Sequence, residues 1–165
     1  MNIFYLDEDP EVAAIVQYNK HVVKMILESA QMLCTAHHEL LYDPDVPYKP
    51  AHVNHPSTIW CRQNTRHYFW LYEHMLALGH EYTHRYGKVH SCQTTMNAAE
   101  KVFEEKTGKT LLCHKESTPF AFAGPDVFKY DTSIDTFTAY KNYISSKPWA
   151  ASNYLRDPSK KPNWL

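Results

Sequence analysis

The stretch from Asn19 to Thr35 constrains the fold of this 165-residue chain more than any other segment. Wound as a helix at about 100° per residue, it gathers its polar side chains in one sector roughly 80° wide. These side chains are His21, Lys24, Glu28, Gln31 and Thr35. The opposite side carries Val22, Val23, Ile26, Leu27, Ala30 and Leu33. A solvated helix face usually carries a broad mixture of charges, so this narrow stripe predicts the wall of a pocket.

The remaining chain favours a mostly α fold, because it holds only 4 glycines and few strand signals. Capping residues and apolar periodicity predict five helices. They span Pro10 to about Tyr18, Asn19 to about Leu41, Ser57 or Thr58 to Tyr86, Ser91 to Lys106, and Thr132 to Ser145. Gly87 is expected to stop the third of them.

The connecting segments complete the predicted architecture. Residues 2–6 favour a stub strand or an extended lead-in, residues 43–56 a proline-rich loop, and residues 111–130 an ordered loop packed on the helices. We expect one compact helical bundle spanning residues 1–165, with a long central helix, a short extended N-terminus and an irregular C-terminal tail.

Composition limits the partners of the chain. It carries 17 basic and 18 acidic residues, so no global field attracts nucleic acid and any DNA binding requires a local patch. Four widely spaced cysteines form no C-x-x-C pair, which predicts free thiols. With no secretion signal and no run of transmembrane length, we expect no membrane partner and a cytoplasmic location, the host cytoplasm if the chain is phage-encoded.

Chemistry is indicated first by the polar stripe. Glu28 follows Lys24 by four residues and His21 by seven, so the three side chains stack along one helix face. A carboxylate beside a cation can hold a perturbed pKa or stabilise a developing positive charge, and a desolvated lysine can act as a nucleophile. The alternative is a surface Lys–Glu pair with a surface histidine.

The segment from His80 to His84 reads His-Glu-Tyr-Thr-His, which matches the zinc-peptidase pattern of two imidazoles on one helix face. Arg85 follows directly, where a cation would lie close to the metal. No third ligand stands in a recognised motif, although Glu100 and Glu104 are available. We therefore expect no metal, and keep zinc at His80 and His84 as the alternative.

A third group of residues combines cations, aromatic rings and amides that could hold a phosphate and stack a base. It comprises His55, Trp60, Arg62, Asn64, Tyr82, Arg85, Lys88 and His90. The alternative is that the cations near Gly87 cap helix carbonyls.

Three motifs in this order resemble the pyrimidine-dimer DNA glycosylase superfamily, which contains endonuclease V-type enzymes and their phage and bacterial relatives. Lys20-His21 through Glu28 is similar to the early helix of that family, where a histidine precedes the catalytic glutamate by seven residues. His55-Pro56-x-x-x-Trp60 resembles the opening of its long second helix. The segment from Glu81 to Gly87 resembles the Glu-Trp-Thr-x-Arg-Gly close of that helix.

The resemblance implies an amine attack on the sugar C1′ through a protonated Schiff base, with a glutamate stabilising the cation. Carried over, Glu28 takes the carboxylate role and His21 a supporting one. The family uses the amine of a small second residue after methionine removal, whereas Asn2 disfavours that removal. This leaves the Met1 amine, Lys24 or a different chemistry. Leu27 and Gln31 stand where the family has basic residues.

We therefore expect a DNA repair glycosylase, with or without an AP-lyase step, acting on a pyrimidine N-glycosidic bond through Glu28, His21 and Lys24. DNA or a nucleotide is the expected partner, and no cofactor is expected unless zinc is bound. Three alternatives stay open. They are an enzyme for a free nucleotide or nucleoside derivative held by Arg62, Arg85 and Lys88, a zinc hydrolase at His80 and His84, and a non-catalytic phage interaction protein.

Overall fold

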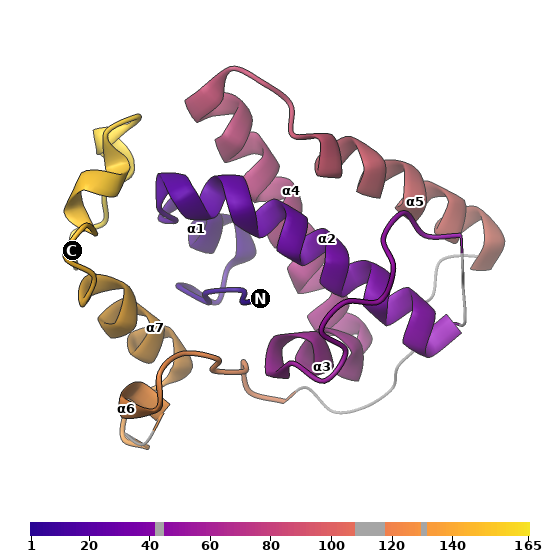
Figure 1. Ribbon diagram of the computed structural model, residues 1–165, viewed down its shortest axis with the longest axis horizontal. Coiled ribbons are helices and arrows are strands. Elements are labelled where there is room, and N and C mark those ends of the chain that lie inside the picture. The colour runs from indigo at the N-terminus through magenta and orange to yellow at the C-terminus, as the bar shows by residue number, and fades with distance from the viewer. Residues whose placement is uncertain (42–44, 108–117, 130–131) are drawn as a thin grey trace.

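The computed structural model describes residues 1–41, 45–107, 118–129 and 132–165, and within these ranges the chain is mostly helical and contains no strand. Figure 1 shows α2 crossing the middle of the molecule, with α7 and the C-terminal tail on one side and α5 on the other. The α-helices are α1 (Pro10–Ile15), α2 (Asn19–Leu41), α3 (Pro56–Gln63), α4 (Thr65–Tyr86), α5 (Ser91–Thr107), α6 (Asp126–Lys129) and α7 (Thr136–Ser145). The 3-10 helices are η1 (Ala151–Tyr154) and η2 (Pro158–Lys160).

The predicted central helix is confirmed as α2, which packs against α3, α4 and α5. Val22, Ile26 and Leu33 are fully buried on its apolar side, as the periodicity indicates. Val23 and Leu27, from the same predicted side, are each 38% exposed. The buried apolar stripe is therefore narrower than predicted.

The predicted first helix is shorter in the structure. Asp9 caps α1 by accepting hydrogen bonds from the next two free amides, and Pro10 occupies the first turn, as predicted. The helix ends at Ile15 rather than near Tyr18. The carbonyls of Ile15 and Gln17 both accept hydrogen bonds from Arg85, because the chain bends there to meet α4.

The predicted helix from Ser57 or Thr58 to Tyr86 is two helices, α3 and α4, joined at Asn64. Asn64 has an extended backbone with φ −158°, which ends α3, and its Oδ1 accepts a hydrogen bond from the amide of His67 to cap α4. The cap of α3 is His55, whose Nδ1 accepts from the Ser57 amide. Gly87 stops α4 in the left-handed region with φ 67°, as predicted.

In the second half of the chain, the helix boundaries differ from the predicted ones. The last predicted helix begins at Thr136 instead of Thr132, because Asp135 caps it by accepting from the Thr138 amide. The predicted loop contains the short helix α6, and its Phe120 and Phe122 pack on the core. Residues 43–44, 111–117 and 130 of the predicted loops lie outside the described residues.

The extended N-terminal segment passes through the interior, and Ile3, Tyr5 and Leu6 in it are buried with the helices in one core. Cys34, Cys61 and Cys92 are free and buried, as predicted, whereas Cys113 lies outside the described residues. None of the described helices is both long and apolar enough to cross a membrane.

Candidate functional site

The carboxylate of Glu28 lies where α2, α3 and the start of the chain meet. Its Oε2 accepts a hydrogen bond of 2.8 Å from the Asn2 amide and lies 3.7 Å from the α-amine nitrogen of Met1. Its Oε1 lies 3.1 Å from Nζ of Lys24. Glu28 is only 7% exposed, so the alternative of a surface pair describes Lys24, whose side chain is 70% exposed, but not its partner.

The start of the chain is held tightly beside this carboxylate. The Met1 side chain is 2% exposed, and Oγ1 of Thr58 in α3 lies 3.3 Å from its sulfur. Oδ1 of Asn2 accepts hydrogen bonds from the amides of Ile3 and Phe4 and from the hydroxyl of Tyr140 in α7. These contacts fix the position of both the Met1 amine and the Asn2 amide relative to Glu28.

His21 lies on the same face of α2, two turns before Glu28, which is about 10 Å along the helix axis. Its ring stacks on Phe4 with centroids 4.1 Å apart, and its Nδ1 lies 3.0 Å from Oε1 of Gln17. Burial, reinforced by the charges of Lys24 and Lys20, lowers the pKa of His21 to about 3. His21 is therefore a neutral hydrogen-bonding group near pH 7, and it does not touch Glu28.

Among the predicted substrate-binding residues, His55 belongs to this centre. Burial lowers its pKa, the positive Met1 amine and His52 lower it further, and the Glu28 carboxylate opposes them. The pKa of His55 therefore responds to the charges of both groups that face one another at the start of the chain. As the cap of α3, His55 also orients the helix that carries Thr58.

The next predicted residues along the chain have structural partners. Trp60 is 2% exposed and is packed between the rings of His67 and Phe120. Nη1 of Arg62 donates a hydrogen bond of 2.6 Å to the carbonyl of Val53, which ties down the preceding loop. Asn64 caps α4, as described above, so these three residues shape the scaffold around α3.

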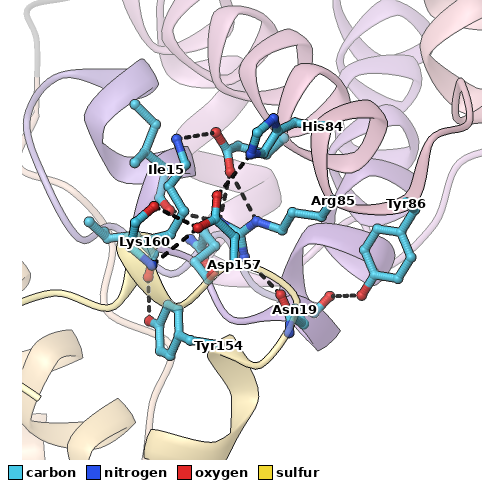
Figure 2. Close-up of polar contacts among 12 residues, drawn as sticks. Ile15, Asn19, His84, Arg85, Tyr86, Tyr154, Asp157 and Lys160 are labelled. Atoms are coloured by element: carbon cyan, nitrogen blue, oxygen red, sulfur yellow. Dashed lines mark hydrogen bonds and ion pairs between the residues drawn. The ribbon is translucent and has the colours of Figure 1, made fainter.

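The remaining predicted residues gather at the far end of α4. Arg85 is 7% exposed. Its guanidinium donates hydrogen bonds to the Glu81 carboxylate, to Oδ1 of Asn19 and to the carbonyls of Ile15 and Gln17. Figure 2 shows Arg85 in this cluster with Asn19 and the tail residues Asp157 and Lys160. Asn19 precedes Glu28 by nine residues, about 13 Å along α2. The structure does not bring Arg85 to Glu28.

Near the end of α4, Tyr82 stacks on Tyr86 and meets the edge of His90, with ring centroids 5.0 Å apart in both pairs. Lys88 is exposed on the turn that follows. This group adjoins the Arg85 cluster rather than the Glu28 carboxylate, since the hydroxyl of Tyr86 donates to the Asn19 carbonyl. The predicted substrate-binding set is thus divided between two places.

The residues of the His-Glu-Tyr-Thr-His segment are separately engaged. Glu81 pairs with Arg85 and with Nζ of Lys160 at 3.2 Å, and His84 Nε2 lies 2.8 Å from Asp157 Oδ2. His80 is exposed. In the part of the chain that the structure describes, no group of three or more His, Cys, Asp or Glu side chains could hold a metal ion.

The proposed third ligands do not join that segment. Glu100 is buried beside the Tyr68 hydroxyl, which donates to its Oε1, and beside Nε2 of His37 at 3.4 Å. The side chain of Glu104 lies outside the part of the chain that the structure describes. Among the residues that the structure describes, the zinc alternative therefore gains no third ligand to join His80 and His84.

Three positioning residues of the Glu28 centre, Asn2, Thr58 and Tyr140, carried no signal that singled them out. In the sequence, Asn2 indicates only that methionine removal is disfavoured, and Thr58 indicates only a helix cap. Tyr140 lies 138 positions from the residue it binds, so no local pattern connects the two.

The chain was compared with protein-family models, with curated proteins and with solved structures. No family model matches it, and neither of the other two comparisons finds a match.

Proposed function

We propose that the chain is a DNA glycosylase with a lyase step, acting on a pyrimidine N-glycosidic bond. One observation carries the proposal: the α-amine of Met1 lies 3.7 Å from a buried carboxylate, that of Glu28. An amine that forms a Schiff base needs a group that takes its proton and then stabilises the positive charge. The three motifs that resemble pyrimidine-dimer glycosylases support the same chemistry.

In the proposed reaction, Glu28 accepts the proton that the Met1 ammonium gives up. The amine nitrogen then bonds to C1′ of the sugar, and the C1′–N bond breaks with its electron pair leaving on the base, which takes up a proton. Opening of the sugar ring yields a protonated imine, whose positive charge lies beside the Glu28 carboxylate. Water then hydrolyses the imine, either directly or after β-elimination of the 3′ phosphate has cleaved the strand.

Met1 is a better candidate for the nucleophile than Lys24. The Lys24 ammonium is mostly solvated and must lose side-chain freedom to attack, whereas the Met1 side chain is buried and its backbone is already positioned. Lys24 then acts through its charge, 3.1 Å from Oε1 of Glu28.

A free nucleotide held by Arg62, Arg85 and Lys88 has less support. Arg62 and Arg85 make their hydrogen bonds to protein groups, which leaves only Lys88 exposed for a phosphate.

The proposal is tested by borohydride trapping on DNA duplexes that contain a pyrimidine dimer, a modified pyrimidine or an abasic site. We expect a covalent adduct that mass spectrometry locates on the peptide containing Met1. Glu28→Gln should slow its formation by about 10²–10⁴-fold. Glu39→Gln, an exposed carboxylate on the same helix, is the matched control and should leave the rate unchanged.

Lys24→Gln separates the two amines, because it should keep the adduct on Met1 if Met1 is the nucleophile. An adduct located on Lys24 would replace Met1 in that role. Absence of any adduct across all three substrates, from protein with an unchanged circular dichroism spectrum, would overturn the proposed function.

A further inference from the structure

A second feature on the His21 side of α2 is a cavity of about 210 Å³. Aromatic rings form most of its wall, and they come from the N-terminal segment, from the start of α2, from α7 and from the chain that follows α7. The lining residues used below are Phe4, Tyr18, His21, Tyr143, Lys147 and Trp149. We call this cavity the aromatic pocket.

The ring of Phe4 is held in the aromatic pocket by a strained backbone. Phe4 has φ 57°, in the left-handed region that bulky residues rarely adopt. Its amide donates to Oδ1 of Asn2, and its carbonyl accepts a hydrogen bond of 3.0 Å from Nε2 of Gln17. Such strain persists where the surroundings enforce it, and it is concentrated at functional sites. Here it places the Phe4 ring flat on His21.

Two lysines lie over rings of the aromatic pocket. Nζ of Lys147 lies 4.1 Å from the centroid of Tyr143, and Nζ of Lys20 lies 4.5 Å from the centroid of Trp149. Among the described residues, neither ammonium forms an ion pair with a carboxylate. The pocket therefore combines stacking surfaces with two positive charges that no described carboxylate neutralises.

We propose that the aromatic pocket binds a nucleobase by stacking, with the adjoining phosphate held by Lys147 and Lys20. At about 210 Å³ the cavity is smaller than a typical ligand site and suits one base, with sugar and phosphate outside. This inference rests on the proposed function for its role. The pocket lies about 10 Å from Glu28 along α2, so its base is a neighbour of the reacting nucleotide.

The experiment titrates the full chain with thymidine monophosphate and, separately, with a short single-stranded oligonucleotide, and follows tryptophan fluorescence. We expect saturable quenching that is lost in Trp149→Phe. Lys147→Gln should weaken binding about ten-fold, and it should lower the slope of log affinity against log salt by about 0.7. Comparable affinity for both ligands identifies a free nucleotide as the source, whereas tighter binding of the oligonucleotide identifies a strand.

Lys101→Gln is the matched control, because it removes one exposed charge from α5 on the opposite side of the molecule (Figure 1) and should bind as the wild type does. The inference is overturned if the wild type shows no quenching with either ligand, if Trp149→Phe is quenched as the wild type is, or if Lys147→Gln binds as tightly as the wild type.

Glu28→Gln separates this inference from the proposed function. We expect that variant to bind both ligands normally while forming the adduct about 10²–10⁴-fold more slowly, since Glu28 does not line the pocket. Normal quenching by a wild-type protein that forms no adduct would keep the pocket and remove the glycosylase.

Discussion

Two cation–carboxylate pairs with the same spacing behave differently in this protein. Lys24 and Glu28 on α2 are four residues apart, as are Glu81 and Arg85 on α4. In the first pair the cation is 70% exposed, whereas in the second the two side chains are 1% and 9% exposed. Burial, and not spacing, separates a pair with an available charge from one that holds the fold together.

The other partners of the two carboxylates explain the difference. Glu28 faces the start of the chain, where amine and amide hydrogens meet it from one side and Lys24 meets it from solvent. Glu81 is enclosed by Arg85 and by Lys160 of the tail, and Arg85 in turn joins α1 and α2 to α4. The Glu28 carboxylate of the α2 pair is therefore available for chemistry, whereas the α4 pair stabilises the packing of the helices.

The largest effect should come from breaking the buried pair. Arg85→Met leaves Glu81 with Lys160 as its remaining partner and the carbonyls of Ile15 and Gln17 without their donor, so we expect a loss of about 3–5 kcal/mol in the free energy of unfolding. Lys24→Met, which removes the cation of the exposed pair, should cost about 0.5 kcal/mol or less. Urea denaturation measures both, and equal losses would refute the distinction drawn from burial.

Acid should affect the two regions at different pH. Because burial lowers the pKa of His21 to about 3, the unfolded chain binds a proton below pH 6.5 that the folded chain excludes. The free energy of unfolding therefore decreases as the pH is lowered from 6.5 towards 3, by about 1.4 kcal/mol per pH unit. His21→Gln should lack this part of the fall when urea unfolding is repeated at pH 7, 6 and 5. An unchanged pH dependence would contradict a buried, neutral His21.

The tail beside the α4 pair should respond only in stronger acid. The Ser159 hydroxyl first, and His84 next, lower the pKa of Asp157 to about 2. Its contribution is present above the ordinary range of an aspartate and is lost as the pH falls towards 2.

A smaller effect is expected from Tyr140→Phe, which removes the hydroxyl that donates to Asn2 and accepts from the Ala123 amide. We expect a loss of about 1–3 kcal/mol in stability and slower adduct formation, because the start of the chain is less firmly placed. Tyr86→Phe is the control near Arg85, since it loses a hydrogen bond to the Asn19 carbonyl. It should lower stability without slowing the adduct, and slowing in both variants would remove the positioning role of Tyr140.

The smallest effect should come from His84→Gln. The bond between His84 and Asp157 is 2.8 Å long, but the histidine side chain is 59% exposed. Exposed ion pairs contribute little, so we expect no resolvable shift in Tm. A clear fall in Tm would show that the tail is held to α4 by this pair rather than by Lys160 on Glu81.

Local pattern predicted the elements whose ends depend on local chemistry. The bounds of α2 follow from its periodicity, and the end of α4 from the left-handed conformation that Gly87 adopts. The end of α1 could not be predicted, because it depends on Arg85, 70 residues beyond Ile15. The break at Asn64 could not be predicted either, because an asparagine in a polar position does not by itself interrupt a helix.

The candidate site was likewise predictable only where it depends on spacing along one helix. Spacing indicated Glu28 and Lys24, and it raised the question of which amine lies near the carboxylate. It could not show that the guanidinium of Arg85 is occupied, because occupancy depends on backbone carbonyls that meet it only in the folded chain. Nor could it indicate Tyr140, which reaches Asn2 from the other half of the sequence.

Asn64 has a consequence for how this architecture can diversify. Asn64 is both the C-cap of α3 and the N-cap of α4, so the two helices are connected directly, with no loop between them. The α3 helix carries His55 and Thr58 towards the start of the chain, and the α4 helix carries the Arg85 cluster. A substitution of Asn64, or a one-residue insertion beside it, would change the orientation of α3 while leaving the Arg85 cluster in place. Such a change offers a simple way to alter the shape of the Glu28 centre.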